Sequence, residues 1–435
     1  MSVQLPEAFV ERVGGQLGSE LSSFLDAMAA PPVRGIRMNP RRTGGKTPFR
    51  DAEERIPWCE WGWTLRGDSP AGVTIAHEAG AFYLQEPGAM LPAEVLRAQP
   101  GEKILDLCAA PGGKSTQMGL AMGGSGLLVC NEPVPKRAAI LSRNIERMGI
   151  PGAIVISAWP EQLAERWPEG FDGVMVDAPC SGEGMFRRDP ETIREWSPEK
   201  AAGCALRQRE ILEAAARLVR PGGRMVYATC TFHPEENEEQ VKHFLAGHPE
   251  FEPESFRLPG ADGADGWFTC WPHRSPGGGQ FAALLRKKGD RLARLPGGSE
   301  AFRVPREERG AWQAAGLDLP EPNALFGRTL VSAPEIPDLK GIRVLRLGLH
   351  LGERRGKVFL PDHAAAMSFA AGELPEAELT EEQALKYLAG EALAAPQEGW
   401  RLMKYQGLPL GWGKGSEGQI RNHYPKGLRN SLLIG

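Results

Sequence analysis

The sequence predicts an α/β protein built on a mainly parallel, doubly wound sheet. Between residues 73 and 288, short apolar runs alternate with amphipathic helical stretches, which is the pattern of βαβ units. The chain has 435 residues, more than one ordinary domain holds. We therefore expect a helical N-terminal module over residues 1–72, a linker over 289–300, and a small α+β region of one or two modules over 301–435.

The elements of the predicted core follow one another at regular intervals. Strands are expected over residues 103–108, 126–132, 153–156, 171–176, 224–228 and 280–285, where short apolar runs are bounded by turn residues. Helices are expected over residues 135–148, 197–219 and 235–245. Beyond the core, residues 342–349 are strand-like. Because ligands in such sheets bind at the carboxyl ends of the strands, the functional residues are expected there.

The composition is that of a globular protein in a reducing compartment. No apolar run approaches the roughly 20 residues that span a bilayer, and the N-terminus lacks the basic and apolar segments of a signal peptide. We therefore expect a cytoplasmic protein without a membrane partner. The seven cysteines include no C-x-x-C pair, so they are expected to be free thiols, and no metal site is expected.

The net charge of −4 conceals an uneven distribution of basic residues. They gather in residues 34–50, 341–357 and 401–435, and the middle of the chain carries the compensating acids. Basic ends around a neutral-to-acidic body suit an enzyme that binds a polyanion through appended modules. Solvated surface charge is an equally good explanation of the pattern taken alone.

The first predicted strand runs into the motif D-L-C-A-A-P-G-G-K, residues 106–114. Gly112 and Gly113 allow close approach of a ligand, and the helix that follows offers free N–H groups. The motif is neither the dinucleotide fingerprint nor the phosphate-binding loop, which disfavours NAD and ATP. About twenty residues on, Glu132 ends the second strand, where an acid can bind a ribose diol. The alternative is that Glu132 only caps the next helix.

Two cysteines stand at strand ends over the same expected ligand site. The fourth strand runs into V-D-A-P-C-S-G-E-G, which contains Asp177 and Cys180, and the fifth runs into Y-A-T-C-T-F, which contains Cys230. A single cysteine in such a place is usually an inert small hydrophobe. Two thiols together, beside an acid and opposite a nucleoside-binding loop, favour a catalytic role.

These motifs resemble those of the RNA 5-methylcytosine methyltransferases of the Nop/Sun type, and most closely the bacterial RsmF-type subgroup that acts on small-subunit ribosomal RNA. The resemblance rests on D-L-C-A-A-P-G-G-K, D-A-P-C-S-G-E-G-M-F-R-R-D-P, Y-A-T-C-T-F-H-P-E-E-N-E and G-G-Q-F-A-A-L-L-R, and it is strong over about residues 30–288. It implies a Rossmann-like class I methyltransferase core, S-adenosyl-L-methionine as cofactor, and RNA (16S rRNA or the small ribosomal subunit) as partner. It also implies an RNA-binding role for the N-terminal module, residues 1–72, and for the C-terminal region, which has a PUA-like end.

The resemblance also implies roles for individual residues. Cys230 would be the nucleophile that adds to carbon 6 of cytosine, which activates carbon 5 toward the methyl group. Asp177 would lie against ring N3, and Cys180 would assist the final elimination that releases Cys230. The implied cofactor contacts are Cys108, Ala109, Ala110, Pro111, Gly112, Gly113, Lys114, Glu132, Arg137 and Asp177.

One position departs from the family pattern. Members usually carry Asp or Asn near the adenine after the third strand, whereas this chain has Ala158 and Trp159. Trp159 either stacks on the adenine or belongs to the core. The target base must leave its stack to react, and residues 184–188, G-M-F-R-R, either hold RNA or form an ordinary basic turn.

Two other functions stay open at this point. One is cytosine-5 methylation of tRNA, which the thiol pair does not separate from rRNA methylation. The other is a non-catalytic RNA-binding assembly factor, which the intact Asp177, Cys180 and Cys230 argue against. In either case residues 301–435 are expected to position RNA through phosphate contacts, unless they only cover an apolar face of the catalytic domain. The expected contacts are Arg354, Arg355, Arg421, Lys426 and Arg429.

Overall fold

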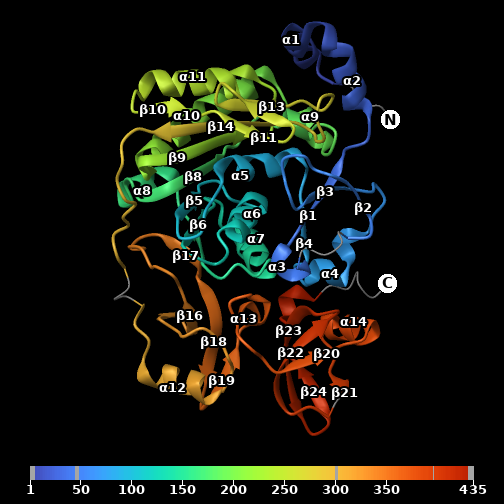
Figure 1. The fold of residues 1–435 in the computed structure, drawn as a ribbon, viewed down its shortest axis with the longest axis vertical. Coiled ribbons are helices and arrows are strands. Elements are labelled where there is room, and N and C mark those ends of the chain that lie inside the picture. The colour runs from blue at the N-terminus through green and yellow to red at the C-terminus, as the bar shows by residue number, and fades with distance from the viewer. Residues whose placement is uncertain (1–4, 45–48, 299–301, 395, 430–435) are drawn as a thin grey trace.

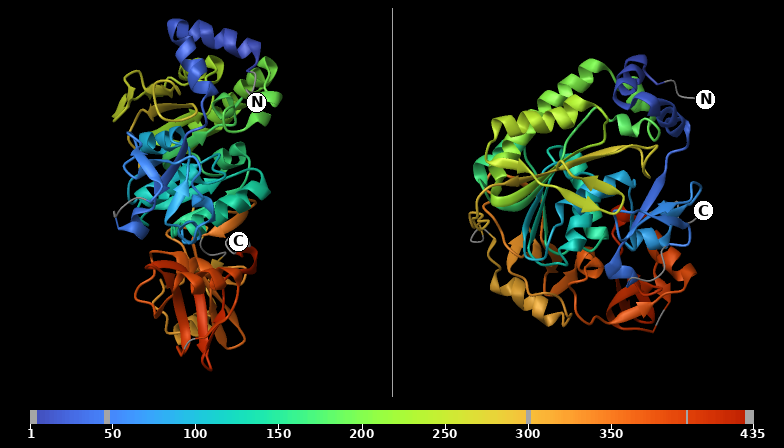
Figure 2. Two further views of the ribbon diagram at one scale, coloured as in Figure 1. Left: turned by 90° about the vertical axis from the view of Figure 1, so that its right-hand side faces the viewer. Right: turned by 45° about the horizontal axis from the view of Figure 1, so that its top comes forward.

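The described part of the chain covers residues 5–44, 49–298, 302–394 and 396–429 of a computed structural model. It folds around one large mixed sheet, with the N-terminal helices at one end of the molecule and the C-terminal modules at the other (Figure 1 and Figure 2). No helix in those ranges is long and apolar enough to cross a membrane. Nor do those ranges bring together three or more His, Cys, Asp or Glu side chains in a group that could hold a metal ion.

The large sheet confirms the predicted α/β core. Its described strands run in the order β10-β14-β9-β8-β5-β6-β7-β17, and β13 pairs with β14. The parallel centre consists of β5 (Lys103–Asp106), β6 (Leu127–Asn131), β7 (Ala153–Ser157), β8 (Phe171–Asp177) and β9 (Val219–Thr229). The antiparallel flanks are β10 (Phe251–Pro253), β13 (Trp267–Cys270), β14 (Gln280–Lys287) and β17 (Arg343–Leu347). Every strand predicted for the core is present.

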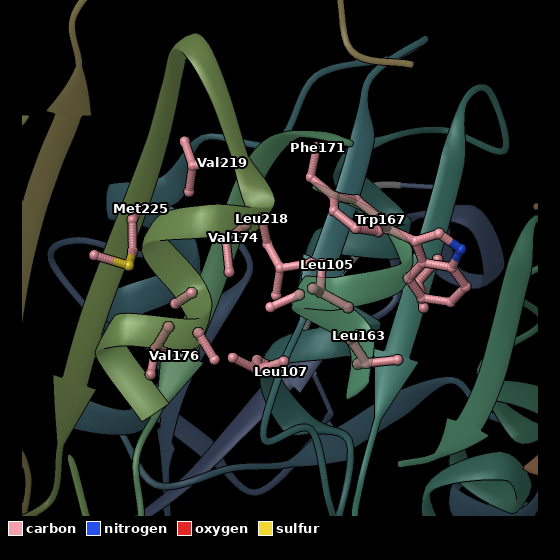
Figure 3. Close-up of a cluster of buried hydrophobic side chains, with 14 of the residues drawn as sticks. Leu105, Leu107, Leu163, Trp167, Phe171, Val174, Val176, Leu218, Val219 and Met225 are labelled. Carbon is pink, nitrogen blue, oxygen red and sulfur yellow. The ribbon is translucent and has the colours of Figure 1, made fainter. Parts of the chain in front are cut away.

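Helices cover both faces of this sheet. One face carries α5 (Leu91–Leu96), α6 (Gly113–Ala121) and α7 (Pro135–Arg147), and the other carries α8 (Pro160–Arg166), α10 (Pro198–Leu218) and α11 (Glu238–Gly247). Figure 3 shows the second face, where Trp167 and Phe171 meet edge to face with ring centroids 6.0 Å apart. Leu105, Val174 and Leu218 belong to the same cluster. Burying one such side chain stabilises the fold by about 1.5–3 kcal/mol, so this interface fixes the sheet that carries the site.

The beginning of β9 differs from the prediction. The preceding helix ends at Leu218 and the strand begins at once at Val219, whereas the sequence placed the strand after residues 221–223, P-G-G. Pairing with β8 shifts register between Phe171 and Gly173, so a β-bulge absorbs the additional residues. Gly222 has φ of 79° there, a conformation that glycine adopts without strain.

The N-terminal module contains the expected helices and also a small sheet. The helices α1 (Glu7–Leu17) and α2 (Leu21–Ala29) pack through Phe9 and Phe24 against Phe186 and Phe232 of the catalytic core. The sheet has the order β2-β3-β1-β4, with β1 (Arg34–Met38), β2 (Ala52–Arg55), β3 (Gly62–Leu65) and β4 (Phe82–Leu84). It extends past residue 72, where the sequence suggested the end of the module.

The C-terminal region forms two further sheets. The first has the order β15-β16-β18-β19, with β15 (Ala324–Phe326), β16 (Thr329–Ser332), β18 (Leu349–Arg355) and β19 (Val358–Pro361). The second has the order β20-β22-β23-β24-β21, with β20 (Glu376–Glu378), β21 (Leu393–Ala394), β22 (Gly399–Tyr405), β23 (Leu408–Ser416) and β24 (Gln419–Asn422). Three helices accompany them: α12 (Arg306–Ala314), α13 (His363–Met367) and α14 (Glu381–Ala389).

One strand of this region belongs to the catalytic sheet. β17 pairs antiparallel with β7 at the edge of the large sheet. Val331, Ile336, Leu339 and Leu347 lie in the same hydrophobic cluster as Leu105. The tail therefore covers an apolar face of the catalytic domain. Of the expected linker, residues 289–298 are described and place Leu295 in that core, and residues 299 and 300 lie outside the described residues.

Candidate active site

A cavity of about 590 Å³ opens at the carboxyl ends of the parallel strands. Its wall contains seven of the predicted site residues, namely Cys108, Ala110, Glu132, Arg137, Asp177, Cys180 and Cys230. A second hollow of about 180 Å³ adjoins the cavity and shares three of these residues. Its wall adds the predicted Ala109, Pro111, Gly113 and Lys114. Gly112 lines neither hollow, so its contribution is to the backbone of the loop.

The loop after β5 is held in place by α7. Asn144 donates to the carbonyl of Pro111 at 2.9 Å, and Arg137 donates to the carbonyl of Ala110 at 3.1 Å. Gly112 has φ of 113°, and a Cβ there would lie 3.1 Å from Leu141 of α7. Glycine at this position therefore satisfies both the backbone conformation and the close approach of the helix.

Glu132 directly follows β6 and has only 2% of its surface exposed, in the wall of the larger cavity. One carboxylate oxygen accepts from the backbone N–H of Val134 at 3.0 Å, just before α7. The other lies 3.2 Å from the Arg137 guanidinium, whose side chain is more than half exposed. Glu132 thus does support the start of the helix, and the same carboxylate also faces the cavity.

Cys180 and Cys230 meet across the ends of β8 and β9. Their sulfur atoms are 3.3 Å apart, and the backbone N–H of Cys230 donates to the Cys180 sulfur at 3.4 Å. The hydrogen bond with Cys230, together with burial, raises the pKa of the Cys180 thiol well above its ordinary value. At neutral pH Cys180 is therefore a protonated thiol that can donate to the sulfur of Cys230.

The two loops that carry these thiols are joined by further hydrogen bonds. The hydroxyls of Ser181 and Thr231 are 2.8 Å apart, and the N–H of Gly184 donates to the carbonyl of Cys230 at 2.9 Å. A Cβ at position 184 would lie 2.6 Å from the carbonyl oxygen of Gly279 and 3.0 Å from that of Cys230. Gly184 therefore lets the Cys180 loop approach the Cys230 loop closely, which helps to fix the relative position of the sulfurs.

Asp177 has a partner that the sequence did not reveal. The ammonium group of Lys114 donates to Asp177 at 2.8 Å. Burial lowers the pKa of Lys114, but the attraction and hydrogen bond of Asp177 together outweigh it, so its pKa is raised and the amine stays charged. Asp177 lines both hollows, so this pair stands where they meet. Lys114, predicted as a cofactor contact, thus forms an ion pair with Asp177, the predicted contact of the target base.

Asp106 is a site residue that the sequence-based assignment left out. It is fully buried, lines the smaller hollow, and accepts from the Ser115 hydroxyl at 2.6 Å. Burial raises its pKa to about 7. Within the described residues its second oxygen has no hydrogen-bond partner. Its position as the first residue of the D-L-C-A-A-P-G-G-K motif could have indicated that it belongs to the site.

Trp159 lies at the mouth of the larger cavity. Its surface is 65% exposed, so the interpretation of Trp159 as a core residue is wrong. The neighbouring Ala158 is buried, and its N–H donates to the Asn131 side chain at 3.0 Å. Val134, on the wall of the same cavity, is also exposed. Trp159 and Val134 thus offer two apolar side chains against which the flat ring of a ligand can pack at this end of the larger cavity.

The two arginines of the G-M-F-R-R segment have different surroundings. Arg187 donates to the backbone carbonyls of Ala27 and Gly277, so it holds the N-terminal module and a loop together. Arg188 is exposed and lines the smaller hollow beside Lys114. Only Arg188 is free to meet a ligand that enters there.

Matches to protein families cover most of the chain. The model described as 16S rRNA methyltransferase RsmB/F matches residues 93–286. Models specific to RsmF match the flanking parts: its N-terminal domain at residues 5–87, its first C-terminal domain at 312–369 and its PUA domain at 375–430. The last match agrees with the expected PUA-like end.

Individual relatives match over nearly the whole length. Ribosomal RNA small subunit methyltransferase F of Klebsiella pneumoniae is 32% identical over 98% of this chain and 97% of its own, and that of Salmonella heidelberg is 34% identical over the same shares. The solved structure of a methyltransferase homologue from Pyrococcus horikoshii is 25% identical and superposes with a TM-score of 0.57 over 66% of this chain and 96% of that chain. The chain therefore belongs to the RsmB/F family of 16S rRNA methyltransferases, which depend on S-adenosylmethionine.

Proposed function

We propose that this protein transfers a methyl group from S-adenosyl-L-methionine to carbon 5 of a cytosine in 16S rRNA of the small ribosomal subunit. The observation that carries the chemistry is the pair of thiols, Cys180 and Cys230, with sulfurs 3.3 Å apart beside the cofactor loop and Asp177. The substrate is inferred from the relatives named for the small-subunit RNA, which align with nearly the whole chain.

The cavity suits S-adenosylmethionine in its donor set. The carboxylate of Glu132 can bind the ribose hydroxyls, and the exposed Trp159 and Val134 can hold the adenine between apolar surfaces. The unpartnered buried oxygen of Asp106 is an acceptor for an ammonium group. The loop from Cys108 to Lys114 would enclose the amino acid end. When bound, the cofactor supplies an electrophilic methyl group for carbon 5.

Cys230 would begin the reaction as a thiolate. Its sulfur forms a bond to carbon 6 of cytosine, and the electron pair of the bond between carbons 5 and 6 becomes available at carbon 5 for the new carbon–methyl bond. Asp177 and its partner Lys114 would hold a proton at ring N3 while negative charge develops there. The base would lie at the junction of the two hollows, where Asp177 lines both and Cys230 lines the larger cavity.

Cys180 would complete the reaction. After methyl transfer, carbon 5 carries both the methyl group and its original proton. As a thiolate, Cys180 takes that proton, the electron pair re-forms the double bond between carbons 5 and 6, and the bond from carbon 6 to Cys230 breaks. The raised pKa of Cys180 depends on its hydrogen bond with Cys230. That bond ends when the Cys230 sulfur bonds to carbon, so Cys180 ionises more readily in the adduct.

The surface beyond the smaller hollow would bind the RNA strand. Arg188 stands at its edge, and a further hollow of about 340 Å³ contains Arg143 of α7 and Arg429 of the C-terminal module. Asn144, beside Arg143, lines this hollow and also bonds the cofactor loop. Arg188, Arg143 and Arg429 would offer phosphate contacts between the reaction site and the PUA-like end, while Glu78 and Glu146 also line the hollow of Arg143.

Bisulfite mapping of ribosomal and transfer RNA, from cells with and without the gene, tests this proposal. We expect deletion to remove 5-methylcytosine from 16S rRNA and to leave tRNA unchanged. Loss confined to tRNA would contradict the proposed substrate. Unchanged methylation of both RNAs, with the purified protein inactive on either, would contradict the enzymatic activity and favour an assembly factor.

A further inference from the structure

We propose that Arg12, on the N-terminal helix α1, is a positioning residue for the two thiols and acts through the buried carboxylate of Glu183. This inference rests on the proposed function, in which Cys230 and Cys180 perform the chemistry. Arg12 touches neither sulfur, so its effect would be on their geometry. The proposal gives the N-terminal module a part in the reaction itself.

Glu183 links the loop of one thiol to the loop of the other. It follows Cys180 by three residues, and its side chain has no exposed surface. One oxygen accepts from the backbone N–H of Phe232 at 3.0 Å, two residues after Cys230. The other accepts from the indole N–H of Trp196 at 3.0 Å. A shift of this carboxylate would therefore move the Cys230 loop relative to Cys180.

The cation that balances Glu183 comes from the N-terminal module. The Arg12 guanidinium lies 2.5 Å from the Glu183 carboxylate and also donates to the carbonyl of Phe232 at 3.2 Å. Gln16, one turn along α1, donates to the same carbonyl at 3.1 Å. In the described part of the chain, Arg12 is the basic residue in ion-pair contact with Glu183. Helix α1 thus contacts both the Glu183 carboxylate and the Cys230 loop, to which this carboxylate is hydrogen-bonded.

Removing the charge of Arg12 would leave a buried carboxylate without a counter-ion. Such a group either takes up a proton or moves toward water, because an unpaired buried charge is strongly unfavourable. Either response weakens the bond from Glu183 to the Phe232 N–H. Reacting groups misplaced by about 1 Å can lose on the order of 100-fold in rate. The expected result is a slower chemical step with unchanged binding.

The module itself should stay docked without Arg12. Phe232 stacks on Trp271 with centroids 4.9 Å apart and meets Phe24 of α2 edge-on at 5.4 Å. Glu20 pairs with Arg274 at 2.6 Å, which is a second ionic contact between the module and the core. Among the described residues, neither Glu20 nor Arg274 forms a hydrogen bond or ion pair with either thiol loop, so this pair is a matched control. Figures 1 and 2 show α1 and α2 against the same end of the core as α9 (Pro190–Glu195).

The test compares full-length Arg12→Gln, Arg12→Lys, Glu183→Gln, Glu20→Gln and the double variant Arg12→Gln/Glu183→Gln. For each, kcat and KM are measured with 16S rRNA, the Kd of S-adenosylmethionine by calorimetry, and the thermal midpoint. Arg12→Gln should lower kcat by about 10- to 100-fold, with KM and Kd within about twofold of wild type. Arg12→Lys should recover most of kcat, and Glu20→Gln should keep it. The double variant should be no slower than Glu183→Gln alone.

Several outcomes would overturn the proposal. A normal kcat in folded Arg12→Gln would do so, as would a raised KM with normal kcat, because Arg12 would then contact RNA directly. An equal loss of kcat in Glu20→Gln would indicate that the effect comes from loosening of the whole N-terminal module and not from Glu183. If Arg12→Gln does not fold, the double variant decides, since it leaves no buried charge unpaired, and a wild-type kcat there overturns the proposal. Cys230→Ala, run alongside, separates this from the chemistry: activity retained by Cys230→Ala would defeat the proposed role of Cys230, and a wild-type protein inactive on 16S rRNA would defeat the proposed function.

Discussion

Each of the two thiols has surroundings that suit a different step. Cys230 lies on the cavity wall after β9, whereas the loop after β5 and Glu132 after β6 would hold the cofactor. We therefore predict that Cys230→Ala abolishes methyl transfer and leaves the Kd of S-adenosylmethionine within about twofold of wild type. A methyl-transfer assay with calorimetry on the same preparation measures both quantities. Substantial residual turnover would reassign the nucleophile to Cys180.

Cys180→Ala should stop the reaction at a later step, after methyl transfer. Without the Cys180 thiolate to take the proton from carbon 5, the elimination cannot proceed, so Cys230 stays bonded to carbon 6 after methylation. A covalent protein–RNA adduct should accumulate and run as a slow band on a denaturing gel. The double variant with Cys230→Ala is the control and should show no such band. Loss of methylation without any adduct would mean that Cys180 acts before transfer or serves only the structure.

The raised pKa of Cys180 gives this release step a pH dependence of known sign. In the adduct the hydrogen bond to Cys230 has ended, but burial still disfavours the Cys180 thiolate. The fraction of Cys180 that can accept the proton therefore grows as the pH rises. Decay of the isolated wild-type adduct should accelerate from about pH 7 to about pH 9, the range around the ordinary thiol pKa. A decay rate that falls with pH would exclude Cys180 as the proton acceptor.

At the scale of single residues, sequence motifs predicted which side chains gather but not how they pair. Asp177, Cys180 and Cys230 were placed together because parallel strands end at one edge. The bond from Lys114 to Asp177 depends on side-chain direction, which a motif does not contain. The contact of Arg12 with Glu183 joins positions 171 residues apart, and no local pattern indicates such a pair.

At the scale of elements, β17 is fastened to the catalytic domain by a buried ionic cluster. Glu146 of α7 pairs with Arg346 of β17 and lies 2.7 Å from His363 of α13. Burial alone would raise the pKa of Glu146, but Arg346 and His363 outweigh it and lower the pKa to about 2. The strand over residues 342–349 was predicted from its apolar residues. Its pairing with β7 was not predicted, because the residues of a strand do not indicate which distant strand it pairs with at the edge of a sheet.

We predict that Glu146→Gln lowers the free energy of unfolding by about 3–5 kcal/mol, since it leaves Arg346 buried without its carboxylate. The pKa of about 2 lies below the unfolded value of about 4.3. The contribution of Glu146 is therefore complete above about pH 4.5 and is lost as the pH falls toward 2. Urea unfolding at several pH values should show a steeper acid loss in wild type than in the variant. Glu382→Gln, which breaks the exposed pair with Lys386, should cause no measurable change.

At the scale of the whole molecule, the tail has a structural role that limits how its RNA contacts can be studied. A deletion after Lys288 would remove β17 and core residues such as Leu347, and would expose the apolar edge of the sheet. The α/β core was predictable because its strands and helices are locally patterned. The N-terminal sheet and the attachment of the tail were not, since short strands such as β2 carry no apolar alternation and since the contacts of the tail are distant in sequence.

Charge substitutions separate the RNA-binding role from the structural one. Arg354 pairs with Glu307 and Glu308, and Arg355 pairs with Glu353. The other predicted phosphate contacts are Arg421, Lys426 and Arg429, which are exposed and form no ion pair with any described residue. Cations already held by carboxylates gain less from a phosphate, so the predicted cluster divides into two unequal sets.

We predict that replacing Arg421, Lys426 and Arg429 by Gln weakens RNA binding and flattens its salt dependence. For each phosphate that the variant no longer neutralises, the slope of log affinity against log salt should become shallower by about 0.7–0.9. The matched variant with Arg354→Gln and Arg355→Gln should change the slope little, because those cations are already paired. Filter binding of 16S rRNA over a salt series measures the slopes, and the Kd of S-adenosylmethionine, expected to hold, shows that the fold is intact. Equal slopes for wild type and the triple variant would refute a phosphate-binding role for this end of the chain.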